Sequence, residues 1–161
     1  MKTYTLFITV LLNALSSGFF FAWSISVILG TKKASDFTYL ESMQNINREI
    51  LNPAFFIVFF GSLITLIITT FLQFNNKPVF GLVLASVIVY FIGTFGVTAF
   101  GNVPLNNELE ALNITKLSLS ELKNFRVYYE SAWNHFHGIR TISNMASFIL
   151  LLISIFIQKT F

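Results

Sequence analysis

The sequence predicts an all-α protein, an integral membrane four-helix bundle with a cap formed by the two larger connections on one side. Two observations support this fold class. Only 11% of the 161 residues are charged and 55% are hydrophobic, whereas soluble domains have about 25% charged residues. The chain also contains four long runs without a charged side chain, at residues 3–31, 50–76, 78–107 and 141–158.

Each of these runs is long enough to cross a bilayer, which takes roughly 20 apolar residues in a helix. Hydrocarbon offers the backbone no hydrogen-bond partner, so each run must close its own hydrogen bonds as a helix. We therefore expect a single transmembrane domain over residues 1–161, with four spans at residues 4–29, 53–74, 79–100 and 141–157.

The connections predict how the spans are arranged. The first run is longer than the roughly 7–15 apolar residues of a signal-peptide core, so we expect it to be retained as a span. The second and third spans are joined only by the polar turn Asn75-Asn76-Lys77-Pro78, which makes them antiparallel. Both termini are then expected on one side of the membrane, and the two larger connections on the other.

The two larger connections, residues 32–49 and 108–140, contain every acidic residue and form the expected cap. Ser35 offers a helix start in the first connection, and Ser118 with Glu121 has capping-box spacing in the second. No proline follows Ser118, so its helix is expected to continue into the fourth span. Seven of the ten basic residues lie on the cap side, which by the positive-inside rule predicts a cytoplasmic cap.

Composition and motifs exclude several function classes. The net charge is only +3 and no basic run exceeds Lys32-Lys33, which is too little for a nucleic-acid partner. The chain has no cysteine, and therefore no disulfide, thiolate nucleophile or Cys-ligated metal. It also lacks a Gly-rich phosphate loop, a His-Glu-x-x-His metal motif and a nucleophile elbow.

The last helix carries one polar stripe. At 100° per residue, spacings of three and four keep side chains within about 80° of arc. The residues of this stripe are Glu130, Trp133, His137, Arg140 and Asn144. His135 lies well over 100° away, so the two histidines cannot chelate one metal ion from a regular helix. The sequence thus predicts no metal site.

His137 and Arg140 are the catalytic candidates. Arg140 and Asn144 border an apolar run, where an unpaired charge costs several kcal/mol and polar groups usually face an interior cavity. His137 lies one turn from Arg140 and supplies a complementary acid–base group. A structural interpretation stays open for each charged residue: Glu130 on a solvated face, and Arg140 snorkelling to the headgroups.

Amides and a second arginine are expected near this pair. Asn102 and Asn106 flank Pro104, which removes a backbone donor and can open the last helical turn; a capped helix end is the alternative. Asn47 and Arg48 share one face of the helix in the first connection. The candidate ligand-binding residues are therefore Trp133, Asn102, Asn106, Asn47, Arg48 and Asn144.

The first span shows a polar arc of another kind. Asn13, Ser17 and Ser24 lie on one side of it, which is typical of hydrogen bonding between packed membrane helices. We interpret the run Phe19-Phe20-Phe21 as lipid-facing or core bulk, and Trp23 as an interfacial anchor.

Four stretches in order resemble the anthrone oxygenase-like family of small four-span membrane proteins. They are Gly18-Phe-Phe-Phe-Ala-Trp-Ser24, Met43-Gln-Asn-Ile-Asn-Arg48 with Asn52-Pro53, Asn102-Val-Pro-Leu-Asn106, and Trp133 followed by Arg140-Thr141. The resemblance extends over nearly the whole chain and implies a protein of the bacterial inner membrane. Most bacterial members of the family have no established function.

The resemblance implies an oxidoreductase. Fungal relatives convert an anthrone to an anthraquinone with molecular oxygen and without an evident metal or flavin, so no cofactor is expected. Under this hypothesis His137 removes a proton, Arg140 and Arg48 stabilise the oxyanion, and Trp133 stacks on the ligand ring. The orienting amides would be Asn102, Asn106 and Asn47. At the position of His137 the family pattern more often has Asn, with His as a neighbour.

Two other classes of function remain open from the sequence. The same polar residues would suit a non-catalytic membrane protein that binds or passes a lipid, quinone or small aromatic ligand. They would also suit a structural subunit whose cap docks on another protein. A metal enzyme would need Glu108 or Glu130 beside a histidine. The sequence leaves open whether the chain forms a homo-oligomer.

Overall fold

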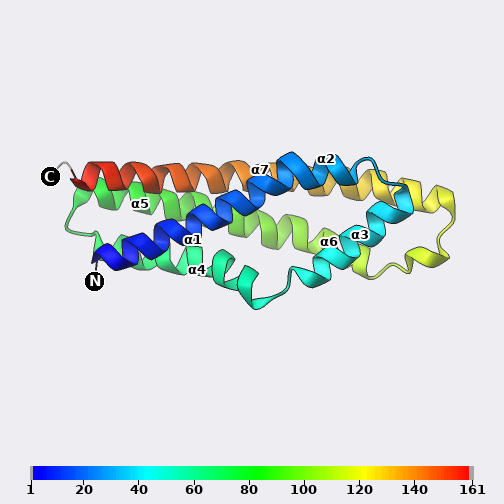
Figure 1. The fold of residues 1–161 in the computed structure, drawn as a ribbon, viewed down its shortest axis with the longest axis horizontal. Coiled ribbons are helices and arrows are strands. Elements are labelled where there is room, and N and C mark those ends of the chain that lie inside the picture. Colours follow the sequence, from blue (N-terminus) through cyan, green and yellow to red (C-terminus); the bar gives the residue numbers. More distant parts are fainter. Residues whose placement is uncertain (1, 160–161) are drawn as a thin grey trace.

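The computed structural model describes residues 2–159, with the side chains of residues 4–158, and these residues form a bundle of helices without strands. Four long helical rods, each apolar enough to cross a membrane, run along the molecule (Figure 1). The first rod comprises α1 (Lys2–Ala22), a π-helical segment (Trp23–Val27) and α2 (Ile28–Thr31). After α3 (Asp36–Glu49), the second rod is α4 (Pro53–Leu72). The all-α bundle predicted from the sequence is confirmed.

The third and fourth rods are the longest. The third comprises α5 (Lys77–Val89), two π-helical segments (Tyr90–Gly96 and Thr98–Asn102) and α6 (Val103–Glu110). A short 3-10 turn (Ile114–Lys116) leads to the fourth rod, α7 (Leu119–Lys159), which is one unbroken helix of 41 residues. As expected, the helix that starts after Ser118 therefore continues into the last apolar run.

The four rods are long and apolar enough to cross a membrane, and the chain is an integral membrane protein. Their apolar stretches are Tyr4–Thr31, Pro53–Leu72, Lys77–Glu110 and Leu119–Gln158. Large apolar side chains such as Phe7, Phe71 and Phe156 are exposed along them, as they would be where a helix faces lipid.

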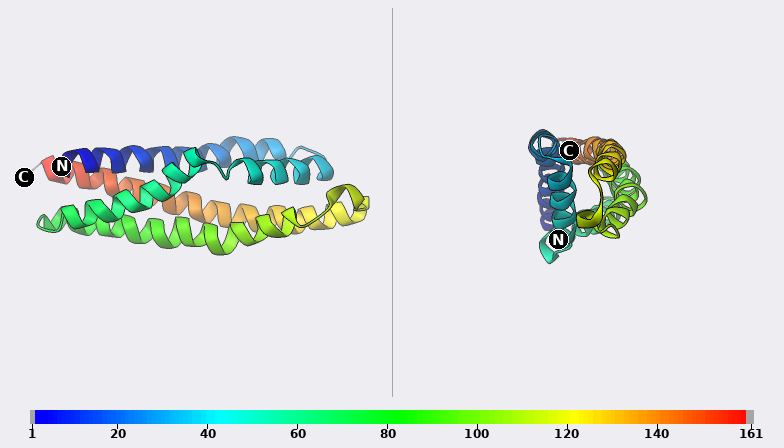
Figure 2. Two further views of the ribbon diagram at one scale, coloured as in Figure 1. Left: turned by 90° about the horizontal axis from the view of Figure 1, so that it is seen from below. Right: turned by 90° about the vertical axis from the view of Figure 1, so that its right-hand side faces the viewer.

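The described chain ends, residues 2 and 159, lie at the same end of the bundle (Figures 1 and 2). At the opposite end, α3 packs against α6 and α7 to form the predicted cap, around a core that includes Leu40, Met43 and Leu109. Arg126 of α7 fastens the start of α3, because its guanidinium donates to the Asp36 carboxylate and to two backbone carbonyls.

Tyr39 completes this cap core. Its ring is buried and lies 4.6 Å from the Arg126 guanidinium carbon. Burial raises the pKa of the Tyr39 phenol above its ordinary value, because the ionised ring would lose its hydration. The phenol therefore stays neutral, and the cation above it interacts with the face of the ring.

The predicted helix starts are present. Ser35 accepts a hydrogen bond from the Thr38 amide, and Asn52 accepts one from the Phe55 amide, with Pro53 as the first residue of α4. Ser118 and Glu121 form a reciprocal capping box. Each cap satisfies backbone donors that the first turn of a helix leaves free.

The third rod differs from the expectation that it ends near Phe100. It continues through Pro104 to Glu110, because π-helical turns precede the proline. The Val103 amide donates to the Thr98 carbonyl, five residues back. Proline has no backbone N–H and would normally break the helix here. The wider π-helical turns change the hydrogen-bond pattern before Pro104, so the helix continues through it.

Candidate functional site

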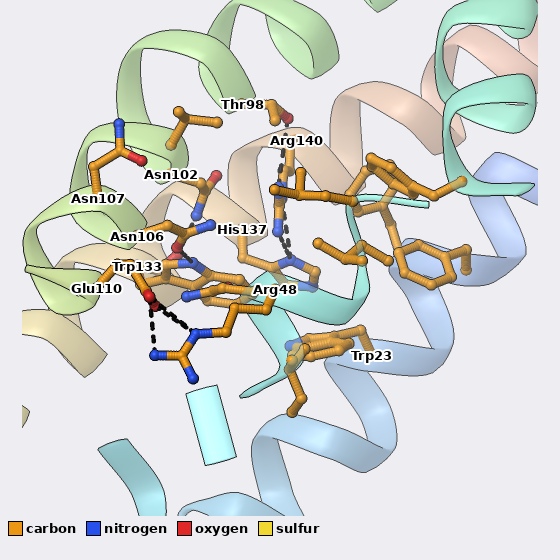
Figure 3. Close-up of a pocket in the computed structure, with 18 residues that line it drawn as sticks. Trp23, Arg48, Thr98, Asn102, Asn106, Asn107, Glu110, Trp133, His137 and Arg140 are labelled. Atoms are coloured by element: carbon orange, nitrogen blue, oxygen red, sulfur yellow. Dashed lines mark hydrogen bonds and ion pairs between the residues drawn. The ribbon is translucent and has the colours of Figure 1, made fainter. Parts of the chain in front are cut away.

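A pocket of about 400 Å³ lies between the first rod, α3, α6 and α7, on the cap side of the bundle. Apolar and aromatic side chains make most of its wall, including Phe19, Phe20, Trp23 and Phe55. Its polar lining residues are Asn47, Arg48, Thr98, Asn102, Asn106, Asn107, Glu110, His137 and Arg140. We call this the cap-side pocket (Figure 3).

Three residues of the predicted stripe enter the pocket from α7. Trp133, His137 and Arg140 are at most 8% exposed, whereas His135 lies on the exposed side of the helix. The rings of Trp133 and His137 are stacked, with centroids 5.1 Å apart and planes 8° apart. The helical spacing therefore produces the single inward face that the sequence predicts.

His137 is held in one tautomer by its neighbours. Its Nδ1 accepts hydrogen bonds from Arg140 Nε at 3.2 Å and Nη2 at 3.0 Å. Because a guanidinium only donates, Nδ1 must be unprotonated, which assigns the ring proton to Nε2. Nε2 lies 3.0 Å from Ser24 Oγ, and Ser24 in turn donates to the Phe20 carbonyl. The network therefore keeps the imidazole neutral.

Arg140 is a buried cation without a carboxylate partner among the side chains of residues 4–158. Its guanidinium carbon lies 4.8 Å from the centre of the Phe20 ring and 4.9 Å from that of Trp133. Apart from His137, its side-chain hydrogen-bond partner is Thr98 Oγ1, at 3.4 Å. Aromatic faces and neutral acceptors compensate a buried charge only in part, so the site favours an anionic ligand atom.

The amides mainly hold Trp133 in place. Asn106 Oδ1 accepts from the Trp133 indole at 2.8 Å and from the Tyr129 hydroxyl at 3.1 Å. Asn102 donates from Nδ2 to the Trp133 carbonyl, while its Oδ1 is buried without a hydrogen-bond partner. Asn47 donates to the Tyr129 hydroxyl. The free oxygen of Asn102 is an acceptor available to a ligand hydroxyl.

Arg48 lies at the exposed rim of the pocket. Its Nε and Nη2 contact the Glu110 carboxylate at 2.9–3.0 Å, and both side chains are about half exposed. The pair joins the end of α3 to the end of α6 (Figure 3). Arg48 is thus already neutralised by a carboxylate, unlike Arg140.

A family model described as anthrone oxygenase matches residues 52–150. The chain belongs to the anthrone oxygenase family. The match confirms the resemblance noted in the sequence and includes Asn102, Asn106, Trp133, His137 and Arg140. No curated protein and no solved structure matches the chain. The part of the pocket wall supplied by residues 19–51 lies outside the family match.

Asn144 is the one predicted site residue of this family member that does not line the pocket. It lies one turn from Arg140 and is fully buried against α1. Its Oδ1 accepts from Ser17 and its Nδ2 donates to Ser16, both at 2.8 Å. Both ends of the amide are therefore used in helix packing, which also explains Ser17 as a packing residue.

Sequence reasoning missed several residues of the site that come from other helices. Phe20 and Trp23 line the pocket instead of serving only as bulk or anchor, Ser24 contacts His137, and Thr98 contacts Arg140. Ser17 and Ser24 of the first span bond Asn144 and His137 of the α7 stripe. The pairing of these two polar arcs is the signal that could have placed the segments side by side.

Metal ligands do not gather in the part of the chain that the structure describes. No group of three His, Cys, Asp or Glu side chains there lies close enough to hold a metal ion. A metal site would have needed Glu108 or Glu130. Glu108 accepts a hydrogen bond from the Tyr128 hydroxyl at 3.1 Å, and Glu130 accepts one from Arg126 at 3.0 Å.

Proposed function

We propose that this protein is a membrane-embedded, cofactor-independent oxygenase for a flat aromatic substrate, a polycyclic phenol of the anthrone type or a hydroquinone. The observation that carries the proposal is Arg140, a buried guanidinium that lines the pocket without a carboxylate partner among side chains 4–158. Such a cation stabilises negative charge that develops on a substrate oxygen. Membership of the anthrone oxygenase family supports the same chemistry.

His137 is the proposed base. Its Nδ1 accepts from Arg140 in the structure, so a substrate oxygen that takes over the guanidinium donors also frees Nδ1. That nitrogen then accepts the proton from the phenol or from the acidic ring methylene, while Nε2 keeps its contact with Ser24. A neutral imidazole is suited to this transfer near pH 7.

The substrate anion then reduces molecular oxygen directly. For a ring methylene, R₂CH₂ and O₂ give R₂C=O and water: two C–H bonds break, the carbon gains one oxygen atom, and the other oxygen leaves with both hydrogens. A hydroquinone instead passes two electrons and two protons to O₂, which yields the quinone and hydrogen peroxide. With that substrate the protein acts as an oxidase, because no oxygen atom enters the organic product. The aromatic wall and the Asn102 oxygen would orient either ring.

Oxygen consumption by the purified protein tests this proposal. With a panel of anthrones and hydroquinones in detergent, we expect uptake by the wild type and a loss of about 10²–10³-fold in Arg140→Met. Lys123→Met is the matched control, because this cation lies on the exposed side of α7, outside the pocket. No uptake by the wild type, or full activity in Arg140→Met, would refute the assignment.

A non-catalytic binding protein is the second candidate. The observation that favours it is the engagement of both His137 ring nitrogens, by Arg140 and by Ser24, because a base needs a free nitrogen. In that case a small aromatic or lipid-like molecule should copurify with the protein, and no compound of the panel should cause oxygen consumption.

We also propose that the protein resides in a bacterial inner membrane with its cap in the cytoplasm. Seven of the ten basic residues belong to the cap side, and three to the side of the termini. The implied partners are the aromatic ligand, molecular oxygen and the surrounding lipid.

A further inference from the structure

A second cavity, of about 550 Å³, adjoins the cap-side pocket between α1 and α4. We call it the lateral cavity. The two cavities share the side chains of Phe19, Phe20, Ile50 and Phe55. Across this shared wall, the rings of Phe19 and Phe55 have centroids 5.8 Å apart. A ligand that occupies both spaces therefore has to pass only aromatic and aliphatic side chains.

The chemistry of the lateral cavity is almost entirely apolar. Its polar residues, Ser16 and Asn52, already have partners: Ser16 accepts from Asn144, and Asn52 caps α4. No charged side chain lines it. It therefore offers hydrocarbon contact but no hydrogen bond or counter-ion that would hold a separate polar ligand.

The lateral cavity lies between two helices that are apolar enough to cross a membrane, and several of its lining side chains are exposed. Both helices that form it belong to apolar stretches long enough to span a bilayer, and it lies where α4 begins, next to the cap. Leu15 is 51% exposed and Phe19 is 39% exposed. At Gly18, which lines only this cavity, an added Cβ would meet no atom within 4 Å.

We propose that the ligand is a membrane-dissolved phenol or hydroquinone with a hydrocarbon tail, whose ring occupies the cap-side pocket and whose tail occupies the lateral cavity. The proposal rests on the function proposed above, which assigns the phenolic ring to the pocket. Arg140 and the free Asn102 oxygen lie at the polar end, and the apolar end faces the bilayer. This is the order in which an amphiphile presents itself at a membrane interface.

Binding of two matched compounds tests this arrangement: trimethylhydroquinone, and the same ring with a decyl chain. Both tryptophans of the chain line the cap-side pocket, so quenching of their fluorescence reports ligand in the pocket. Gly18→Leu fills the lateral cavity without touching the pocket. Gly81→Leu on α5 is the control, since a Cβ there also meets open space and lines neither cavity.

We expect Gly18→Leu to weaken the binding of the decyl compound about tenfold, the loss in affinity when roughly two methylene groups are displaced. The affinity for the tail-less compound should not change. Gly81→Leu should change neither affinity, and measurement in one detergent cancels the partition of the tail into micelles. Ala14→Phe, which also fills only the lateral cavity, provides a second variant should Gly18→Leu fail to fold.

Three results would overturn the inference. Gly18→Leu could weaken the binding of both compounds equally, it could weaken the binding of neither, or the decyl compound could fail to quench the tryptophan fluorescence of the wild type. Oxygen uptake separates it from the proposed function. Tail-dependent binding without oxygen uptake would leave the inference standing and refute the oxygenase. If both compounds are oxidised and Gly18→Leu changes neither rate of oxygen uptake, the oxygenase is supported and the tail site is refuted.

Discussion

The resemblance to the anthrone oxygenase family implies Asn more often than His at position 137, and the contacts of His137 show what such an exchange would remove. An Asn side chain can still accept from Arg140 through its carbonyl, but it is not a base at neutral pH. We expect His137→Asn to remain folded in detergent and its rate of oxygen consumption to fall about 10²–10⁴-fold. Full activity of this variant would refute the assignment of His137 as the base.

Asn106 is expected to stabilise the folded protein. It is the acceptor for two buried donors, the Trp133 indole and the Tyr129 hydroxyl. Asn106→Leu leaves both without a partner, which should cost about 1–3 kcal/mol for each donor. Thermal unfolding in detergent checks this, with Asn107→Leu as the control, because Asn107 is exposed on the same helix. Equal melting temperatures for the two variants would contradict the role of Asn106.

At the residue scale, the sequence predicts what one helix determines by itself. Trp133, His137 and Arg140 share a face because of helical spacing alone, and the structure buries all three. Asn144 lies on the same stripe but is engaged by Ser16 and Ser17. Which stripe residues meet a cavity depends on the partner helix, and no spacing within α7 contains that information.

At the element scale, the third rod shows how close packing supports the site. Gly101 faces α7, where an added Cβ would lie 2.7 Å from the Phe136 ring, and at Gly93 it would collide with the Ser143 side chain. Small residues let these two membrane helices approach. The neighbouring Asn102 is thereby brought within reach of the Trp133 carbonyl.

Gly101→Leu should push the third rod away from α7. We expect a loss of about 1–3 kcal/mol in unfolding free energy, as for an overpacked core, together with weaker ligand quenching because Asn102 moves. Gly81→Leu in the same rod should have neither effect, since its Cβ would meet open space. Denaturation monitored by tryptophan fluorescence compares the two; a Gly101→Leu protein as stable as Gly81→Leu would refute the packing argument.

The end of the third rod is a helix boundary that the sequence could not predict. Pro104 normally stops or starts a helix, so a break near Phe100 is the expectation from local rules. The rod instead passes through Pro104 after two π-helical segments. Such wide turns have no strong sequence signature, since they depend on how neighbouring helices support the backbone.

At the scale of the whole molecule, the bilayer makes the fold predictable. An unpaired backbone group in hydrocarbon costs several kcal/mol. Charge-free runs of this length therefore form helices, which pair their own backbone groups. The short turn before Lys77 then fixes the antiparallel pair, and every acidic residue falls at the cap end. The cap-side pocket lies between the first rod, α3, α6 and α7. The sequence predicted lining residues on α7, on α3 and at the end of the third rod, but not the wall that Phe20 and Trp23 of the first rod supply.

The side of the membrane on which the cap lies can be read with single cysteines, because the chain has none of its own. Lys33 follows α2 at the cap end, Asn75 lies in the turn between α4 and α5 at the other end, and both are exposed. With the cap in the cytoplasm, a membrane-impermeant maleimide should label Asn75→Cys in intact bacterial spheroplasts and reach Lys33→Cys only after permeabilisation. The opposite pattern would place the cap, and the rim formed by Arg48 and Glu110, outside the cytoplasm.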